Sequence, residues 1–196
     1  YDLAKEIDGQ AAATEIARHE LYGCTGAEMV QEMKPYFTDF PNVKNNCLRF
    51  EVSPSIEESS SFTDADWAEL GNDFMQRMGL MNHQYIIIKH SGTESKKEQA
   101  HLHILANRIS LSGELYRDNW IGKRATEAAN AIAKERNFVQ SQDIGKANKE
   151  EIKEVMNSVL KKMQGFDLTK FQEELGKLGF KVREARASTG KLNGYY

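Results

Sequence analysis

The chain has 196 residues, of which 40% are hydrophobic and 28% are charged, and its formal net charge is −3. This composition is typical of a globular domain, no apolar run reaches the roughly 18 to 20 residues of a membrane span, and the acidic total disfavours a protein that coats nucleic acid non-specifically. Cys24 and Cys47 form no CxxC pattern, which predicts reduced thiols in a cytoplasmic protein. Because the chain begins at Tyr1 rather than Met, we expect a fragment.

The first fifty residues predict two helices followed by a strand. Residues 1–20 are rich in Ala, Glu and Ile and favour a helix. Thr25 and Glu28 have the spacing of a capping box, which predicts a second helix that runs to about Phe37. Residues 47–53 alternate apolar and polar side chains, which indicates a half-buried strand.

A strong amphipathic helix and a pair of strands follow. Residues 64–78 carry apolar side chains at i, i+3, i+7 and i+11, with Thr63 before them as a cap and Gly79 after them as a stop. Residues 84–90 are β-branched and apolar, as expected of a central strand, and residues 100–109 form a second strand. The polar stretch between these two segments predicts a hairpin, so that the two strands are antiparallel.

The rest of the chain is mainly helical. The expected elements are a short strand at 115–116, helices over 119–136, 148–163 and 167–178, and a strand at 180–183. The pattern as a whole predicts an α+β fold with a central, mainly antiparallel sheet flanked by helices. We expect a single domain over 1–196 that lacks its first strand and C-terminal regions, with a helical segment at 140–178 within it.

Three histidines carry the most specific chemical signal. His101 and His103 are two residues apart on a strand, and side chains at i and i+2 of a strand lie on the same face. His90 ends the preceding strand, so the three imidazoles can converge on one divalent ion and leave coordination positions open. Glu94 and Glu98 could hydrogen-bond a ligand histidine. The alternative is that these are ordinary, partly exposed strand histidines and solvated glutamates.

The residues around this motif resemble a known family. His101-Leu102-His103-Ile104, with Asn107 and Arg108 after it, is similar to the third motif of relaxases, the mobilization nucleases of plasmids and transposons. The helix at 64–78, the run His83-Gln84-Tyr85 with its isoleucines, and Asp118-Asn119-Trp120 before a helix have the family's order. The segment 171–194 looks like the family's last strands. Relaxases belong to the endonucleases named for a His-hydrophobic-His motif.

The resemblance implies a defined reaction. Relaxases nick one DNA strand at an origin of transfer by tyrosine transesterification and remain joined to the 5′ end, with Mg²⁺ or Mn²⁺ held by three histidines. Tyr1 matches the place of the family's tyrosine, and a phenol with a pKa near 10 needs a metal or a base to assist it. The implied partners are single-stranded DNA at an origin of transfer, accessory mobilization proteins and a coupling protein, without membrane insertion.

Further residues receive roles from the same resemblance. Asn107 is expected to position substrate or a histidine. Backbone amides and basic side chains near the motif are expected to contact DNA, the candidates being Arg108, Arg117, Lys123 and Arg124.

The sequence departs from the family pattern at two places and leaves other functions open. The family usually has an Asp two residues after its first motif histidine, where this chain has Gly92, so that Glu94 or Glu98 is a candidate replacement. The family's first strand, which precedes the tyrosine, is absent, and Tyr22 is a second candidate nucleophile. One alternative is an inactive single-stranded DNA-binding module with a metal site, and another is a structural zinc site. A third is a replication-initiator nickase, which would need a tyrosine on the helix after the motif.

Overall fold

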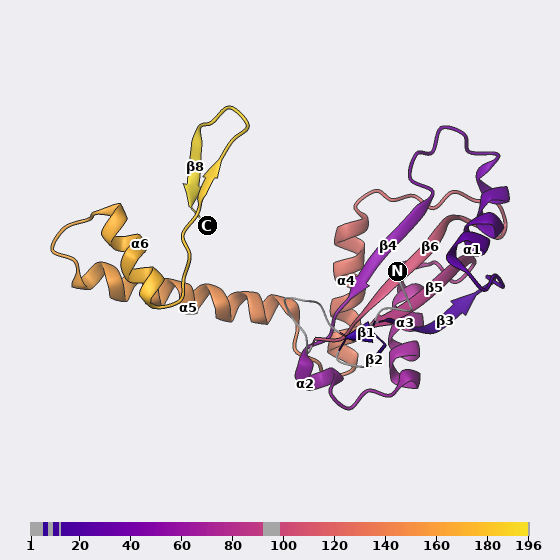
Figure 1. Cartoon of the computed structure of the whole chain (residues 1–196), viewed down its shortest axis with the longest axis horizontal. Helices are drawn as coiled ribbons and strands as arrows, with labels where there is room; N and C mark the ends of the chain where they lie inside the picture. Colours follow the sequence, from indigo (N-terminus) through magenta and orange to yellow (C-terminus); the bar gives the residue numbers. More distant parts are fainter. Residues whose placement is uncertain (1–5, 8–9, 12, 92–98, 196) are drawn as a thin grey trace. The chain divides into compact units, whose positions relative to one another are not determined.

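A computed structural model describes the chain except for residues 1–5, 8–9, 12, 92–98 and 196, and it does not describe the side chains of residues 6–7, 10–11 and 141–142. The chain forms two compact units, Tyr1–Gln140 and Ser141–Tyr196 (Figure 1). The assignment of residues 1–196 to a single domain stays a prediction.

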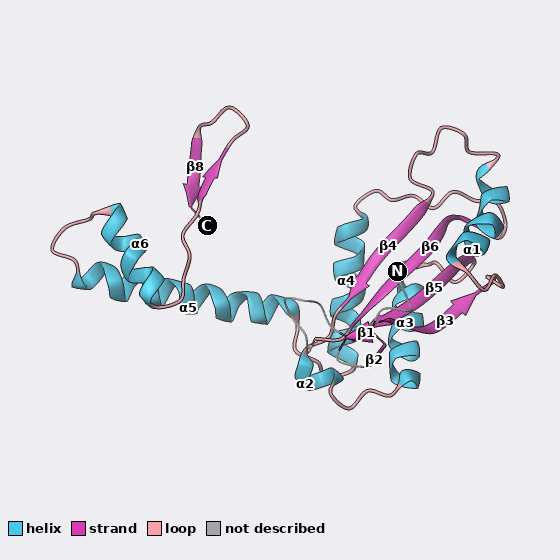
Figure 2. Ribbon diagram, viewed as in Figure 1, coloured by secondary structure: helices cyan, strands magenta, loops and turns pink. Residues whose placement is uncertain are grey.

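A four-stranded antiparallel sheet is the centre of the first unit (Figure 2). Its strands lie in the order β3 (Ala13–His19), β5 (His83–His90), β6 (His101–Ser110) and β4 (Cys47–Val52). The predicted hairpin pairing of β5 with β6 is confirmed, as is the predicted α+β class. Two further short strands, β1 (Glu6–Ile7) and β2 (Gln10–Ala11), pair with each other.

The helix predicted over residues 1–20 is wrong, because residues 13–19 form the edge strand β3. Ala and Glu favour a helix only weakly, and pairing with a neighbouring strand routinely overrides such a preference. Here β3 pairs with β5 from Ala13, which is opposite His90, to His19, which is opposite Tyr85. Pairing with β5 therefore determined the structure of this segment, and the local composition does not contain that information.

Helices cover both faces of the sheet. On one face, α3 (Asp64–Met78) and α4 (Ile121–Glu135) pack against alternate residues of the two central strands, which build the main core. On the other face, Met29 and Met33 of α1 (Gly26–Met33) pack against Ile86 and Ile88 of β5. A 3₁₀ helix at Lys34–Phe37 follows α1, and the one-turn helix α2 (Ile56–Ser59) precedes α3.

The predicted helix signals around α1 and α3 are confirmed. The Thr25 side chain accepts a hydrogen bond from the Glu28 amide, and the Glu28 carboxylate accepts one from the Thr25 amide. Thr63 caps α3 in the same reciprocal way. Gly79 ends α3 with φ of 72°, a left-handed conformation that favours glycine.

The second unit contains two helices and a hairpin. Its elements are α5 (Ser141–Lys162), α6 (Leu168–Lys177), β7 (Glu184–Arg186) and β8 (Leu192–Tyr195). The strand predicted at 180–183 is wrong by several residues, because Phe180 and Val182 pack against the buried cluster between α5 and α6 while the strand pairing with β8 begins at Glu184. Within the described part of the chain, no helix combines the length and apolar character needed to cross a membrane.

Candidate metal site

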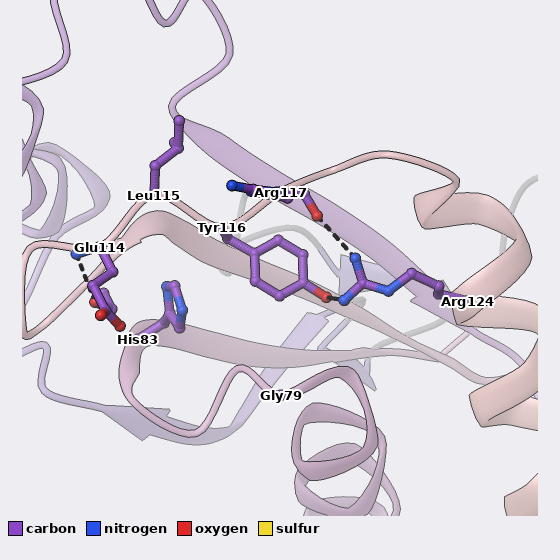
Figure 3. A pocket seen from close by; sticks show the side chains of 8 residues that line it. Gly79, His83, Glu114, Leu115, Tyr116, Arg117 and Arg124 are labelled. Atoms are coloured by element: carbon purple, nitrogen blue, oxygen red, sulfur yellow. Dashed lines mark hydrogen bonds between the residues drawn. The ribbon is translucent and has the colours of Figure 1, made fainter.

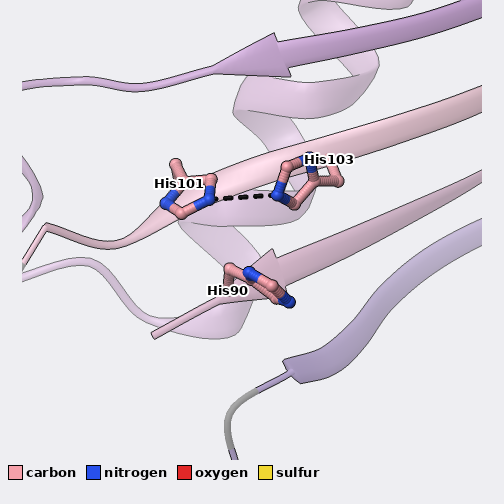
Figure 4. Close-up of side chains that lie close together, drawn as sticks. All are labelled: His90, His101 and His103. Atoms are coloured by element: carbon pink, nitrogen blue, oxygen red, sulfur yellow. Dashed lines mark hydrogen bonds between the residues drawn. The ribbon is translucent and has the colours of Figure 1, made fainter. Parts of the chain in front are cut away.

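The register of the two central strands brings three histidines together at one end of the sheet. His90 on β5 is directly opposite His101 on β6, and His103 lies two residues further along β6 on the same face. Figure 4 shows the three rings turned toward one another. Leu102 and Ile104 point to the opposite face and are fully buried under the helices. The predicted convergence of the three histidines is therefore confirmed.

The distances fit a shared metal ion. One ring nitrogen from each histidine can be chosen so that all three lie within 4.8 Å of one another. The Nε2 atoms of His101 and His103 are 3.0 Å apart. Two metal–nitrogen bonds of ~2.1 Å at a right angle would place the nitrogens about 3.0 Å apart. His101 and His103 are buried and His90 is half-buried, so two ligands are fixed by packing and one side remains reachable.

A hydrogen bond to the backbone orients the ring of His101. The Nδ1 atom of His101 is 3.1 Å from the carbonyl oxygen of Gln99. A carbonyl can only accept, so Nδ1 of His101 carries the proton and its Nε2 presents a lone pair toward the other histidines. This is the orientation that metal-ligating histidines require.

The surroundings of His103 favour its neutral form. Burial, followed by the charges of His101, His90 and Arg49, lowers the pKa of His103 from its ordinary 6.5 to about 4, against the opposite effect of Glu51. A metal ion binds a neutral imidazole directly, whereas a charged imidazole must first lose a proton. His103 is therefore ready to act as a ligand at neutral pH.

Two charged residues of β4 border the site and were missed by the sequence reasoning. Glu51 is directly opposite His103, and Nη2 of Arg49 is 3.5 Å from Nδ1 of His103. The alternation of residues 47–52 places both side chains on one face of β4, and this signal is present in the sequence. The signal does not say which strand β4 pairs with, so it could not connect these side chains to the histidines.

Asn107 lies on β6 but apart from the histidines. It is fully buried, and it is four residues beyond His103, which corresponds to about 13 Å of strand. Its Nδ2 donates to Oε1 of Gln84 at 2.9 Å, and its Oδ1 accepts from the amide of Ile109 at 2.9 Å. Gln84 in turn donates to the carbonyl of Glu20. These contacts link strands and are not directed at the metal site.

The two other histidines are also outside the cluster. His83 is buried at the opposite end of β5, where its Nδ1 is 2.9 Å from the carbonyl oxygen of Asn107, and burial lowers the pKa of its imidazole. His19 stacks on the ring of Tyr85 with centroids 5.2 Å apart. Both histidines therefore make contacts within the first unit, away from the three-histidine cluster.

The expected DNA-binding side chains gather around the far end of the sheet. His83 is opposite Ser110, seven residues from His90, which corresponds to about 23 Å of strand. A pocket of about 320 Å³ opens there, lined by Gly79, His83, Ser110, Glu114, Leu115, Tyr116, Arg117 and Arg124 (Figure 3).

Three of these four cations contact other residues of the protein. Arg108 forms an ion pair of 2.7 Å with Asp118 and donates to the carbonyl of Tyr116. Arg124 donates to the carbonyl of Arg117 at 2.8 Å and to the Tyr116 hydroxyl. Lys123 lies 3.8 Å from Glu127 in an exposed pair on α4. Arg117 and Lys123 are both exposed and therefore more accessible to a phosphate.

The two candidate nucleophiles differ in their relation to the histidines. Tyr1, like Glu94 and Glu98, lies outside the described residues. The strand β3 enters the sheet at Ala13, opposite His90, and its seven residues carry the chain about 20 Å away before Tyr22. Tyr22 is exposed and donates to Glu20, whose carboxylate raises the pKa of the phenol. The structure does not bring Tyr22 to the histidines, and its raised pKa makes it a weaker nucleophile.

A sheet on which three histidines converge, with one side open, offers a site that could hold a metal ion. The sequence model of the family described as Relaxase: MobA/VirD2-like, nuclease domain matches residues 1–138. The chain belongs to this relaxase family, as its motif predicted. Searches among curated proteins and among solved structures found no match.

Proposed function

We propose that this protein is a relaxase that nicks one strand of DNA at an origin of transfer and remains covalently attached to the 5′ end. The observation that carries the proposal is the convergence of His90, His101 and His103 in a chain whose first 138 residues match a relaxase nuclease domain. A divalent ion held there, Mg²⁺ or Mn²⁺, would polarise the scissile phosphate and neutralise the charge that develops on it.

Tyr1 is the proposed nucleophile. Its hydroxyl oxygen forms an ester bond to phosphorus, and the bond from phosphorus to the 3′ oxygen of the preceding nucleotide breaks. The phenol loses its proton, and the departing oxygen takes one up to become a 3′ hydroxyl. One phosphate ester replaces another, so the adduct keeps the energy needed for religation. The supporting observation is that the described strand β3 begins at Ala13, which is opposite His90.

The exposed residues at the start of α4 are the proposed contacts for single-stranded DNA. Trp120 is 81% exposed, with a left-handed φ of 54°, and it lies between Arg117 and Lys123 in the chain. Bases stack on exposed aromatic rings, and cations bind the phosphates. Trp67, the other tryptophan, is buried, so quenching of fluorescence by an oligothymidylate would report on Trp120 and should disappear in Trp120→Phe.

Metal binding is the first test. Calorimetric titration with Mn²⁺ should show one saturable site in the parent protein and none in the double variant His101→Ala, His103→Ala. A parent protein that binds no divalent metal would refute the proposed reaction. Tight zinc binding without a response to Mn²⁺ would favour a structural zinc site instead.

Covalent capture is the second test. The protein is incubated with Mn²⁺ and single-stranded oligonucleotides that tile the DNA around its own gene, and adducts are detected on denaturing gels and mapped by mass spectrometry. We expect an adduct on Tyr1 that is lost in Tyr1→Phe and kept in the matched variant Tyr22→Phe. Saturable DNA and metal binding without any adduct would support the inactive DNA-binding module, which is the second candidate function.

A further inference from the structure

The two nitrogens of His103 face different neighbours. Its Nε2 is 3.0 Å from Nε2 of His101, on the side where an ion would be held. Its Nδ1 is 3.5 Å from Nη2 of Arg49 on the neighbouring strand β4. A guanidinium has hydrogen-bond donors and no acceptor. Nδ1 of His103 can therefore interact favourably with Arg49 only as an acceptor, with the ring proton on Nε2.

Metal binding reverses this arrangement. If Nε2 of His103 gives its lone pair to an ion, the proton of the neutral ring must be on Nδ1. The Nδ1–H of His103 and the N–H groups of Arg49 would then be two donors pointing at each other. A ligand histidine almost always donates its second N–H to a carboxylate, a carbonyl or a water. The metal-bound state therefore needs an acceptor where Arg49 now approaches.

Glu51 is placed to be that acceptor. It is the residue of β4 directly opposite His103, and residues so paired have Cβ atoms ~4.5–5.5 Å apart. Its side chain is exposed and lies on the same face of the sheet as the imidazole of His103. Arg49 lies two residues away on the same face of β4, so both side chains lie on the face of the sheet that carries His103.

We propose that Glu51 is a positioning residue for the metal site: its carboxylate accepts a hydrogen bond from Nδ1–H of His103 when Nε2 of His103 binds the metal. Arg49 opposes metal binding, because it favours the tautomer of His103 that carries its proton on Nε2. The proposal rests on the three-histidine metal site proposed above. It assigns the carboxylate partner of a ligand histidine to β4, whereas the sequence pattern had directed attention to the loop after His90, where Gly92 stands in place of an acid.

The test measures metal affinity and does not require activity. Mn²⁺ is titrated into the whole chain as the parent, Glu51→Gln, Arg49→Gln and a control, Glu57→Gln, which changes an exposed glutamate on α2. Loss of an outer partner of a ligand histidine typically weakens metal binding ~10- to 100-fold. We expect such a loss for Glu51→Gln, equal or tighter binding for Arg49→Gln, and no change for Glu57→Gln. Circular dichroism melting of each variant checks that it remains folded.

The tautomer of His103 provides the second readout. Nitrogen NMR of the imidazoles, with Zn²⁺ as a diamagnetic probe, should place the proton on Nε2 in the metal-free protein and on Nδ1 in the metal-bound protein. Parent-like Mn²⁺ affinity of Glu51→Gln, or an Nδ1 proton already present without metal, would overturn the inference. A parent protein that binds no metal would refute the proposed function itself, so the two failures are distinguishable.

Discussion

Replacing Asn107 by Ala should reduce stability while leaving the metal site intact. The substitution removes two hydrogen bonds of 2.9 Å in a fully buried position and leaves the Ile109 amide and Oε1 of Gln84 without these partners. Each buried polar group left unpaired costs about 1 to 3 kcal/mol, so the free energy of unfolding should fall by roughly 2 to 6 kcal/mol. This is a large share of the ~5–15 kcal/mol of a typical domain.

Urea unfolding monitored by the fluorescence of buried Trp67 measures this change, and hydrogen exchange of the Ile109 amide reports on the lost bond directly. Asn119→Ala, at an exposed site, is the control and should change stability by less than ~0.5 kcal/mol. Mn²⁺ stoichiometry at low temperature should be unchanged in Asn107→Ala. A variant as stable as the parent would refute the stability argument. A variant that stays folded but no longer binds metal would show that Asn107 acts at the metal site.

Three further outcomes are expected. In the metal-free protein, NMR titration should show His103 neutral down to about pH 5, because its pKa is lowered to about 4. Between pH ~6.5 and 4 the unfolded state then binds more protons than the folded state, so the free energy of unfolding should decrease as the pH falls through this range. A titration midpoint of His103 near pH ~6.5 would contradict this. Gly71→Ala should destabilise the protein by about 1 to 2 kcal/mol in thermal melts, since a Cβ there would lie 2.7 Å from Cδ1 of Ile87 and overpacking outweighs the gain in helix propensity. Gly122→Ala on α4, where a Cβ meets nothing within 4 Å, should be neutral or stabilising, and equal losses for both variants would refute the packing argument.

The local sequence was sufficient where one short-range rule decided the structure. Alternation along the strand predicted that His101 and His103 lie on the same face, because the period of a strand allows only two faces. The cap at Thr63 and the apolar stripe after it predicted α3 to the residue at both ends. The histidine motif also predicted the family. The motif can be recognised from the sequence because its three histidines lie on one strand and at the end of the preceding strand.

Only the tertiary structure decided the features that depend on which strands are neighbours. Pairing with β5 made residues 13–19 a strand in spite of their helical composition, and it separated Tyr22 from the histidines. Pairing of β4 with β6 placed Glu51 opposite His103, although the two are far apart in the chain. The buried hydrogen bond from Asn107 to Gln84 depends in the same way on the pairing of β5 with β6. Local propensity and periodicity act over a few residues, whereas strand order and register are set by burial of the whole sheet, and no single segment contains that information.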